Sequence, residues 1–396
     1  MKIGVWMRYG YSPLTGGGFS YFDAFVSKLK EYQFKNGVEW CFVTPASTSE
    51  DSNVVCLGLV PNNNPLIRKL TKKTLYLKII TKLSLMFKKK QVIKKLVKND
   101  ISILYYCNQN EEVITDFPFI STVWDMGYFA TFPFPELIEG RNYKGRMKYF
   151  NKILPKALMI MAESETGKAD LVKYAGITPD KVRVLPIFAG NVINQNVAEE
   201  EQNNYLQQYG LKDNKFFFYP AQFWAHKNHI GILRAFSTFT NNHKDYKIVF
   251  TGGDKGNLDY VKAMSENLSL TDSVCFLGYV SMEALYTFYK KCTALVMASY
   301  FGPTNMPPIE AMNLGCPVIC TDIGGHREIL AEAALYFDAI SSNSLYKRME
   351  EMVKNRELYM DKIIKRKTES PFSIDNAFNC LDKYFSEALT IRSMWG

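Results

Sequence analysis

The sequence of 396 residues lacks long apolar runs. None approaches the roughly 20 apolar residues that a membrane-spanning helix needs. The stretch Met1–Met7 carries one lysine and a strand-like pattern that Arg8 interrupts, without the apolar core of a signal peptide. With 47% hydrophobic residues, however, the chain can bury the cores of two domains. We therefore expect a two-domain protein in the cytoplasm.

Cysteine pairs and metal-ligand patterns are also missing. The eight cysteines include no C-x-x-C, and Cys316 and Cys320 fall in or beside an apolar run, where packing is their expected role. A reducing compartment fits this usage. No D-x-D occurs, and His226 and His229 have no evident third ligand. We predict no metal site and no metal cofactor.

Acidic residues are absent between Asp51 and Asp100, although the chain carries 39 of them. The part from Arg68 to Lys98 holds twelve Lys and Arg residues, more than the net charge of +9, interleaved with apolar residues. Such a basic amphipathic segment, residues 66–99, is typical of docking on an anionic membrane surface. The alternative is an ordinary solvated face of helices packed on a sheet. Nucleic acid binding is not expected, because aromatics are few here and no helix-turn-helix or zinc pattern appears.

Strand-like and helix-like segments alternate in both halves, which predicts α/β architecture. In the first half we expect strands near residues 3–7, 39–43, 101–106, 119–124 and 182–186, and helices over 19–32 and 165–174. In the second half we expect strands near 216–219, 247–250, 274–277, 294–298 and 317–320, a turn at 324–326, and helices over 230–240, around 283–289, up to residue 315 and over 374–389. The predicted units are an N-terminal domain 1–192, an Asn- and Gln-rich linker 193–214, a C-terminal domain 215–370 and a final helix 371–396.

The stretch from Ala294 to Asp322 is the most informative part of the chain. Residues 294–298 form an apolar run without alternation, as expected for a strand buried on both faces of a parallel sheet. Pro307 and Pro308 fit only the first turn of a helix, and Gly315 is a typical helix terminator. The loop between strand and helix therefore lies at the carboxyl edge of the sheet, where such folds bind ligands.

This loop and helix carry groups suited to a nucleotide. The helix-start amides, preceded by Thr304 and Asn305, suit an anionic group such as a diphosphate. Glu310 lies one turn into the helix, close enough to accept hydrogen bonds from a ribose.

Several motifs resemble a known family. Phe301–Met312 with Gly315–Ile319 resembles the donor site of the retaining glycosyltransferases of family 4 (group 1), in a branch with Phe-Gly-Pro-Thr-Asn before the glutamate. Tyr219–His229 resembles the diphosphate loop of that branch, and Ser164-Glu-x-Gly-Lys and Val184-Leu-Pro186 also fit. The resemblance covers nearly the whole chain. It implies a GT-B fold, in which two Rossmann-like domains face a cleft and the C-terminal helix crosses back to the N-terminal domain.

The resemblance also implies roles for single residues. Glu310 matches the second glutamate of the E-x7-E motif, which holds the ribose of the nucleotide-diphosphate sugar donor, whereas the first glutamate falls at Gly302. Lys227 matches the lysine that neutralises the diphosphate, and the arginine usual five residues earlier is Gln222. Asp125, at the place of the family's His-Asp, is expected on the acceptor side. The remaining donor-binding residues implied are Gly16, Gly17, Gly18, Pro303, Thr304, Asn305, Met306 and Pro307. The catalytic residues expected are Asp125, Lys227 and Glu310.

Each residue also has a simpler interpretation. A glutamate in the first turns of a helix is favourable without a ligand, and a lone lysine is usually a surface residue. Gln222 can stabilise its own loop, Asp125 can cap the next segment, and the three glycines can form a plain turn.

The implied function is a retaining hexosyltransferase that needs no metal. It would move a hexose, with mannose a candidate, from a nucleotide sugar to a lipid-linked saccharide in surface polysaccharide biosynthesis of the O-antigen or capsule type. Residues 66–99 would hold it at the inner face of the plasma membrane. Two alternatives remain: a nucleotide-sugar epimerase of the same fold, and a non-catalytic nucleotide-binding partner at the membrane. The sequence predicts neither the donor base nor the oligomeric state.

Overall fold

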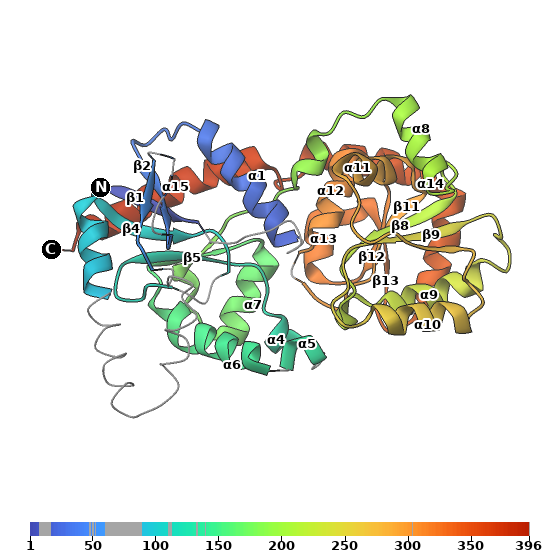
Figure 1. Ribbon diagram of the computed structural model, residues 1–396, viewed down its shortest axis with the longest axis horizontal. Helices are drawn as coiled ribbons and strands as arrows, with labels where there is room; N and C mark the ends of the chain where they lie inside the picture. The colour runs from blue at the N-terminus through green and yellow to red at the C-terminus, as the bar shows by residue number, and fades with distance from the viewer. Residues whose placement is uncertain are drawn as a thin grey trace, which may run out of the picture.

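The computed structural model of the chain consists of two α/β halves that lie side by side (Figure 1). The structure describes residues 1–7, 17–46, 49, 51, 53–59, 89–109, 113–131, 134–138, 140–302 and 304–395. Within these ranges, each half is built around one parallel sheet. None of the helices in the described ranges combines the length and the apolar character needed to cross a membrane.

The sheet of the first half has seven strands among the described residues, in the order β3-β2-β1-β4-β5-β6-β7. All neighbouring strands run parallel, and Gly4 in β1 lies opposite Cys41 in β2 and Leu104 in β4. The strands are β1 (Lys2–Trp6), β2 (Glu39–Thr44), β3 (Val54–Cys56), β4 (Ile101–Tyr106), β5 (Phe119–Val123), β6 (Met159–Ala162) and β7 (Val182–Val184). The helices are α1 (Gly17–Glu31), residues 89–98, α4 (Gly127–Ala130), α5 (Pro135–Ile138), α6 (Gly140–Lys148) and α7 (Glu165–Ala175), with short π or 3-10 turns at Tyr149–Ile153, Leu154–Lys156, Pro179–Lys181 and Asn191–Asn194.

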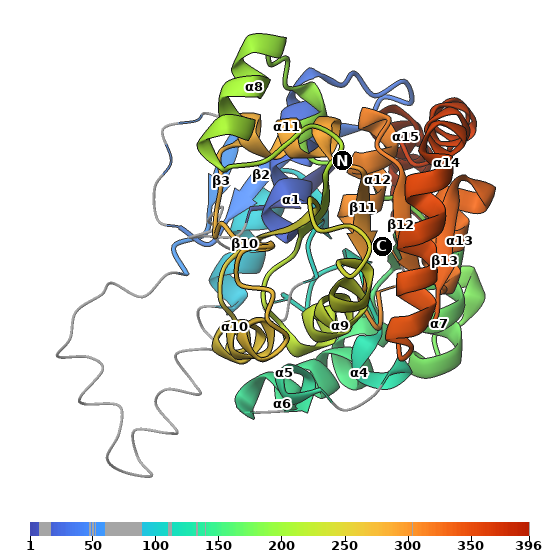
Figure 2. The same cartoon turned by 90° about the vertical axis from the view of Figure 1, so that its right-hand side faces the viewer.

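The sheet of the second half has six parallel strands in the described part of the chain, in the order β10-β9-β8-β11-β12-β13. The strands are β8 (Phe216–Pro220), β9 (Lys247–Thr251), β10 (Val274–Phe276), β11 (Ala294–Met297), β12 (Val318–Thr321) and β13 (Ala334–Phe337). The helices are α8 (Glu199–Gln208), α9 (His229–Phe239), α10 (Leu258–Asn267), α11 (Met282–Lys291), α12 (Met306–Leu314), α13 (Gly324–Leu330), α14 (Ser342–Glu369) and α15 (Ile374–Ser393), with 3-10 turns at Ala225–Lys227 and Ala331–Ala333. Both views show α8 and α11 on one side of this sheet and α9 and α10 on the other (Figure 2).

The strand order reverses once in each sheet. β1 lies between β2 and β4, and β8 lies between β9 and β11. A crevice opens at the carboxyl ends of the strands at such a switch point, because the connections leave to opposite faces. In the second sheet, β8 ends at Pro220 and β11 ends at Met297. The loops that carry Lys227 and Thr304 therefore start at the same crevice.

The local rules that predicted α12 hold in the structure. All four residues of β11 are buried, as expected for a strand inside a parallel sheet. Pro307 and Pro308 lie in the first turn of α12, where a missing N–H costs little. Gly315 ends the helix with a φ of +73°, a conformation that favours glycine. The predicted strand–loop–helix–strand order is confirmed.

The last helix, α15, packs against the first half, as the GT-B resemblance implied (Figure 1). Phe378 contacts Phe25 of α1 with ring centroids 5.2 Å apart. Arg183, in β7 of the first sheet, forms an ion pair with Glu387 of α15. The backbone N–H of Lys35 donates to the buried carboxylate of Asp382 at 2.8 Å. These contacts tie the end of the chain to its beginning.

Three expectations differ from the structure. Residues 193–214, assigned to a linker, contain the helix α8, whose buried Leu206 belongs to the core. Residues 324–326, expected as a turn, form the first turn of α13, because the peptide after β12 continues directly into a helix. Gly17 and Gly18 begin α1 and do not form a loop. The sequence interpretation also missed α14 and β13.

Candidate active site

A cavity of about 780 Å3 opens between the two halves. Its volume is in the range of small-molecule sites. All the predicted site residues in the described part of the chain line it, namely Gly17, Gly18, Asp125, Gln222, Lys227, Gly302, Thr304, Asn305, Met306, Pro307 and Glu310. Gly16 and Pro303 lie outside the described residues. The fold thus brings the residues selected from the sequence into one cleft, while the role of each stays a prediction.

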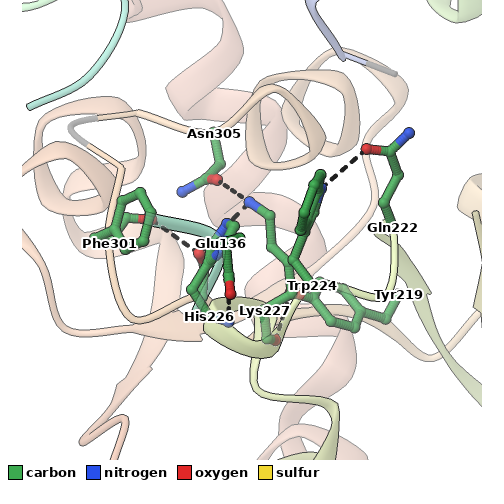
Figure 3. A network of polar contacts seen from close by, with 9 residues as sticks. Glu136, Tyr219, Gln222, Trp224, His226, Lys227, Phe301 and Asn305 are labelled. Atoms are coloured by element: carbon green, nitrogen blue, oxygen red, sulfur yellow. Dashed lines mark hydrogen bonds and ion pairs between the residues drawn. The ribbon is translucent and has the colours of Figure 1, made fainter. Parts of the chain in front are cut away.

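Lys227 is a half-buried cation in the wall of this cleft. It closes the 3-10 turn after β8, and the hydroxyl of Tyr219 donates to its backbone carbonyl at 2.8 Å. Its ammonium donates to Asn305 Oδ1 at 3.0 Å and to Ser299 Oγ at 3.5 Å (Figure 3). Burial lowers the pKa of Lys227 to about 8, against the opposing attraction of Asp125 and Glu136. Near pH 7 the ammonium is therefore charged, yet only weakly neutralised by neighbouring carboxylates.

The first turn of α12 offers fewer free backbone N–H groups than the sequence suggested. Pro307 and Pro308 have no N–H, so Met306 and Ile309 carry the amides of the first turn. The amide of Thr304 donates to Glu163 Oε1 at 3.0 Å, and its hydroxyl bonds the same oxygen. Thr304, expected among the donor-binding residues, is thus hydrogen-bonded to a carboxyl of the other half, and its role in donor binding stays a prediction.

Glu163 is a cavity residue that the sequence interpretation missed. It directly follows β6, is 4% exposed and lines the cleft. Burial raises the pKa of Glu163 well above its usual value, and Asp125 adds to this, while the hydrogen bonds from Thr304 oppose it. A carboxyl at the end of a buried strand, just before the helix cap Ser164, was the available signal.

Glu310 is buried in the cavity wall on α12. Its Oε2 accepts a 2.7 Å hydrogen bond from the hydroxyl of Tyr289 on α11. Burial raises the pKa of Glu310, whereas the bonds from Tyr289 and the backbone of Gly190 lower it. A Cβ at residue 190 would lie 3.0 Å from Glu310 Oε1, so this glycine allows the first half to approach the carboxyl closely. The remaining carboxyl oxygen faces the seam between the halves.

Gln222 and Asp125 both make local hydrogen bonds. Trp224 donates from its indole N–H to Gln222 Oε1 at 3.1 Å (Figure 3). The Gln222 amide donates to the Tyr279 hydroxyl at 3.3 Å. Asp125 Oδ1 accepts from the backbone of Gly127 at 3.0 Å. The simpler structural roles are therefore present for both residues, next to any role in binding.

Carboxylates also connect the two halves at the rim of the cleft. Glu136 on α5 accepts from the backbone N–H of His226 at 2.9 Å and lies 2.5 Å from its Nδ1. Burial raises the pKa of Glu136, but the bonds from His226 outweigh it and leave the pKa below its usual value. From the opposite side, Glu328 on α13 accepts from the backbone N–H and the hydroxyl of Thr166 on α7. The two halves are thus in direct contact through these two carboxylates.

Among the described residues, no three His, Cys, Asp or Glu side chains form a group that could hold a metal ion.

A family model matches the second half of the chain. Residues 201–369 match the model described as "Glycosyl transferases group 1". This range includes Lys227, Asn305 and Glu310, so the match covers the predicted donor-binding side of the cleft.

Curated relatives cover about half of the chain. The chain is 29% identical over 211 residues to a protein of Campylobacter jejuni, the N-acetylgalactosamine-N,N'-diacetylbacillosaminyl-diphospho-undecaprenol 4-alpha-N-acetylgalactosaminyltransferase. The aligned part covers 52% of this chain and 53% of that protein. The chain is 28% identical over 198 residues to the O-antigen chain mannosyltransferase RfbU of Salmonella typhimurium, which is 49% of this chain and 51% of that protein. The chain spans about half the length of the curated relatives it matches.

The whole fold has counterparts among solved structures. Anabaena Alr3699/HepE in complex with UDP aligns over 98% of this chain and 100% of that chain, with a TM-score of 0.67 and 15% identity. At this identity the likeness concerns the fold. Together with the two parallel sheets, this likeness identifies the architecture as GT-B. The match to the group 1 glycosyltransferase domain concerns the second half alone.

Proposed function

We propose that this protein is a retaining glycosyltransferase of the family 4 type. It moves a hexose, with mannose the first candidate, from a nucleotide-diphosphate sugar to a lipid-linked oligosaccharide in surface polysaccharide biosynthesis. The observation that carries the proposal is the convergence of Lys227, the start of α12 and Glu310 in one cleft between two Rossmann-like halves. We also propose the limits 1–192 and 215–370 for its two domains, 193–214 for a connecting segment that includes α8, and 371–396 for the final helix.

The cleft has the electrostatics that departure of a diphosphate needs. A partly buried ammonium stabilises developing negative charge more than a fully exposed one, because less water screens it. Lys227 supplies this charge, and the N-terminal end of α12 adds its dipole at the same edge of the sheet. The carboxyl of Glu310 can accept hydrogen bonds from ribose hydroxyls. Asp125, from the first half, also lines the cavity and is assigned to the acceptor side.

The proposed acceptor and location rest on the relatives and on charge. The names of the two relatives refer to a diphospho-undecaprenol saccharide and to the O-antigen chain. In the described part of residues 66–99, the helix over 89–98 keeps Val92 and Leu96 buried and exposes its lysines. Such a face binds anionic lipid headgroups at roughly 1 kcal/mol per lysine. We propose peripheral attachment to the inner face of the plasma membrane; residues 66–88 lie outside the described ranges.

Calorimetry with a panel of nucleoside diphosphates tests the donor site and names the base. The matched activity assay incubates nucleotide sugars with a lipid-linked acceptor and separates the products by thin-layer chromatography. Binding without transfer would favour a non-catalytic partner, and conversion of the sugar in the absence of acceptor would favour an epimerase. Proton NMR of the product shows whether the anomeric configuration is retained. Failure of every nucleoside diphosphate to bind would contradict the proposal.

A further inference from the structure

A continuous hydrogen-bond chain leads from a backbone carbonyl in the sheet to the ammonium of Lys227. His326 Nδ1 lies 2.9 Å from the carbonyl oxygen of Thr321, at the end of β12. His326 Nε2 lies 3.1 Å from Asn305 Nδ2. Asn305 Oδ1 accepts from Lys227 at 3.0 Å. Thr321 and His326 are fully buried and Asn305 is 9% exposed, so water competes little for these hydrogen bonds.

The hydrogen bonds of this series can run in only one direction, because one end of it is a group that can only accept. A backbone carbonyl accepts and never donates, so the hydrogen of His326 must be on Nδ1. The Thr321 hydroxyl, 3.2 Å from the same nitrogen, already donates to the carbonyl of Ser299 at 2.8 Å and can only accept as well. His326 Nε2 is then an acceptor. Asn305 must turn its NH2 group towards it, which leaves the amide oxygen facing Lys227.

The imidazole must be neutral for this arrangement. An imidazolium would place an N–H against the NH2 group of Asn305. Burial lowers the pKa of His326 to about 4, and the charge of Lys227 adds to this, while the bond to Thr321 and the charge of Asp322 oppose it. The carboxylate of Asp322 is already bound by Arg327. His326 therefore keeps the same tautomer across the neutral pH range.

We propose that His326 is a positioning residue for donor binding. It fixes the amide of Asn305 so that the amide oxygen of Asn305 holds the Lys227 ammonium at the N-terminus of α12. The inference rests on the proposed role of Lys227 as the diphosphate ligand. Ser299 Oγ, which donates to the carbonyl of Phe301 at 2.8 Å, is a second acceptor for the ammonium. Two of its three N–H groups are thus held by neutral acceptors, which orient the charge without neutralising it. A free Asn305 amide could turn its NH2 group towards Lys227 and repel it.

The tautomer can be tested on the unaltered protein. Long-range 1H–15N spectra of protein labelled at its four histidines report which ring nitrogen carries hydrogen. The signal that disappears in His326→Gln is that of His326. We expect hydrogen on Nδ1 and a bare Nε2 from pH 6 to pH 8. Hydrogen on Nε2, or an imidazolium at pH 7, would overturn the proposed chain.

A double-mutant cycle tests the link to Lys227. His326→Phe keeps a ring but has no acceptor, whereas His326→Gln keeps an amide acceptor near the Nε2 position. Calorimetry with the best-bound nucleoside diphosphate should show about tenfold weaker binding for His326→Phe and a loss within about threefold for His326→Gln. In a Lys227→Met background, His326→Phe should have no further effect.

The outcomes separate the inference from the function it rests on. Binding to His326→Phe at wild-type affinity, or an equal loss in the Lys227→Met background, contradicts the positioning role alone. No binding of any nucleoside diphosphate to the wild type contradicts the proposed function, and the inference with it. If His326→Phe fails to fold, the spectra of the wild type decide.

Discussion

Raising the pH from 7 to 9 should weaken the binding of a nucleoside diphosphate by about tenfold. The ammonium of Lys227 is the charge that meets the diphosphate, and its pKa in the free protein is about 8. About nine tenths of the free protein carries this charge at pH 7 and about one tenth at pH 9, which corresponds to ~1.4 kcal/mol of binding free energy. The bound phosphates raise the pKa of Lys227, so the loss begins near pH 8 and continues as the pH rises.

The two histidines near Lys227 and the carboxyl of Glu136 do not titrate in this window. Burial holds His326 neutral, with a pKa of about 4, and lowers the pKa of His226 despite its contact with Glu136. Glu136 has a lowered pKa and stays ionised. The last ionisation of a phosphate, at about pH 6, also lies below the range. Burial also raises the pKa values of Glu163 and Glu310, so a variant of Lys227 that stays charged is needed to assign the decline to this side chain.

Calorimetric titrations at pH 7, 8 and 9 and constant ionic strength measure the effect. Lys227→Arg is the matched control, because its guanidinium stays charged throughout and its affinity should not change with pH. Lys227→Met should bind weakly at every pH. Equal wild-type affinity at pH 7 and pH 9, or the same decline in Lys227→Arg, would refute the reasoning.

Three further predictions concern other parts of the molecule. Glu310→Ala should weaken nucleoside diphosphate binding more than tenfold, an effect above about 1.4 kcal/mol; Tyr289→Phe, which spares the carboxyl, serves as its control in the same calorimetry. Glu163→Gln should melt close to the wild type, because an amide oxygen still accepts from the Thr304 amide, whereas Glu163→Ala should lose about 1–3 kcal/mol of stability; equal melting temperatures for the two variants would show that this contact between the halves is unimportant. Exchanging the lysines of residues 89–98 for glutamate should reduce flotation with anionic liposomes at low salt, and wild-type flotation that is insensitive to salt would contradict electrostatic docking.

The sequence by itself determined the order of most strands and the two loops that meet at the cleft. Apolar runs without alternation located the buried strands, such as β8 and β11, and proline and glycine located the ends of α12. These signals are local, since they depend on the backbone and on neighbours a few residues away. In parallel sheets, the carboxyl ends of adjacent strands meet at one edge. For this reason Lys227 and Glu310 could be assigned to one site before their distance was known.

Only the tertiary structure decided what each polar group of the cleft binds. Thr304 is bound by Glu163, 141 residues away, and Glu136 by His226, 90 residues away. Asn305, which lines the cavity, links Lys227 to His326. Which partner a buried donor takes depends on which groups the packing of two sheets brings within about 3 Å. No spacing along the chain encodes that choice.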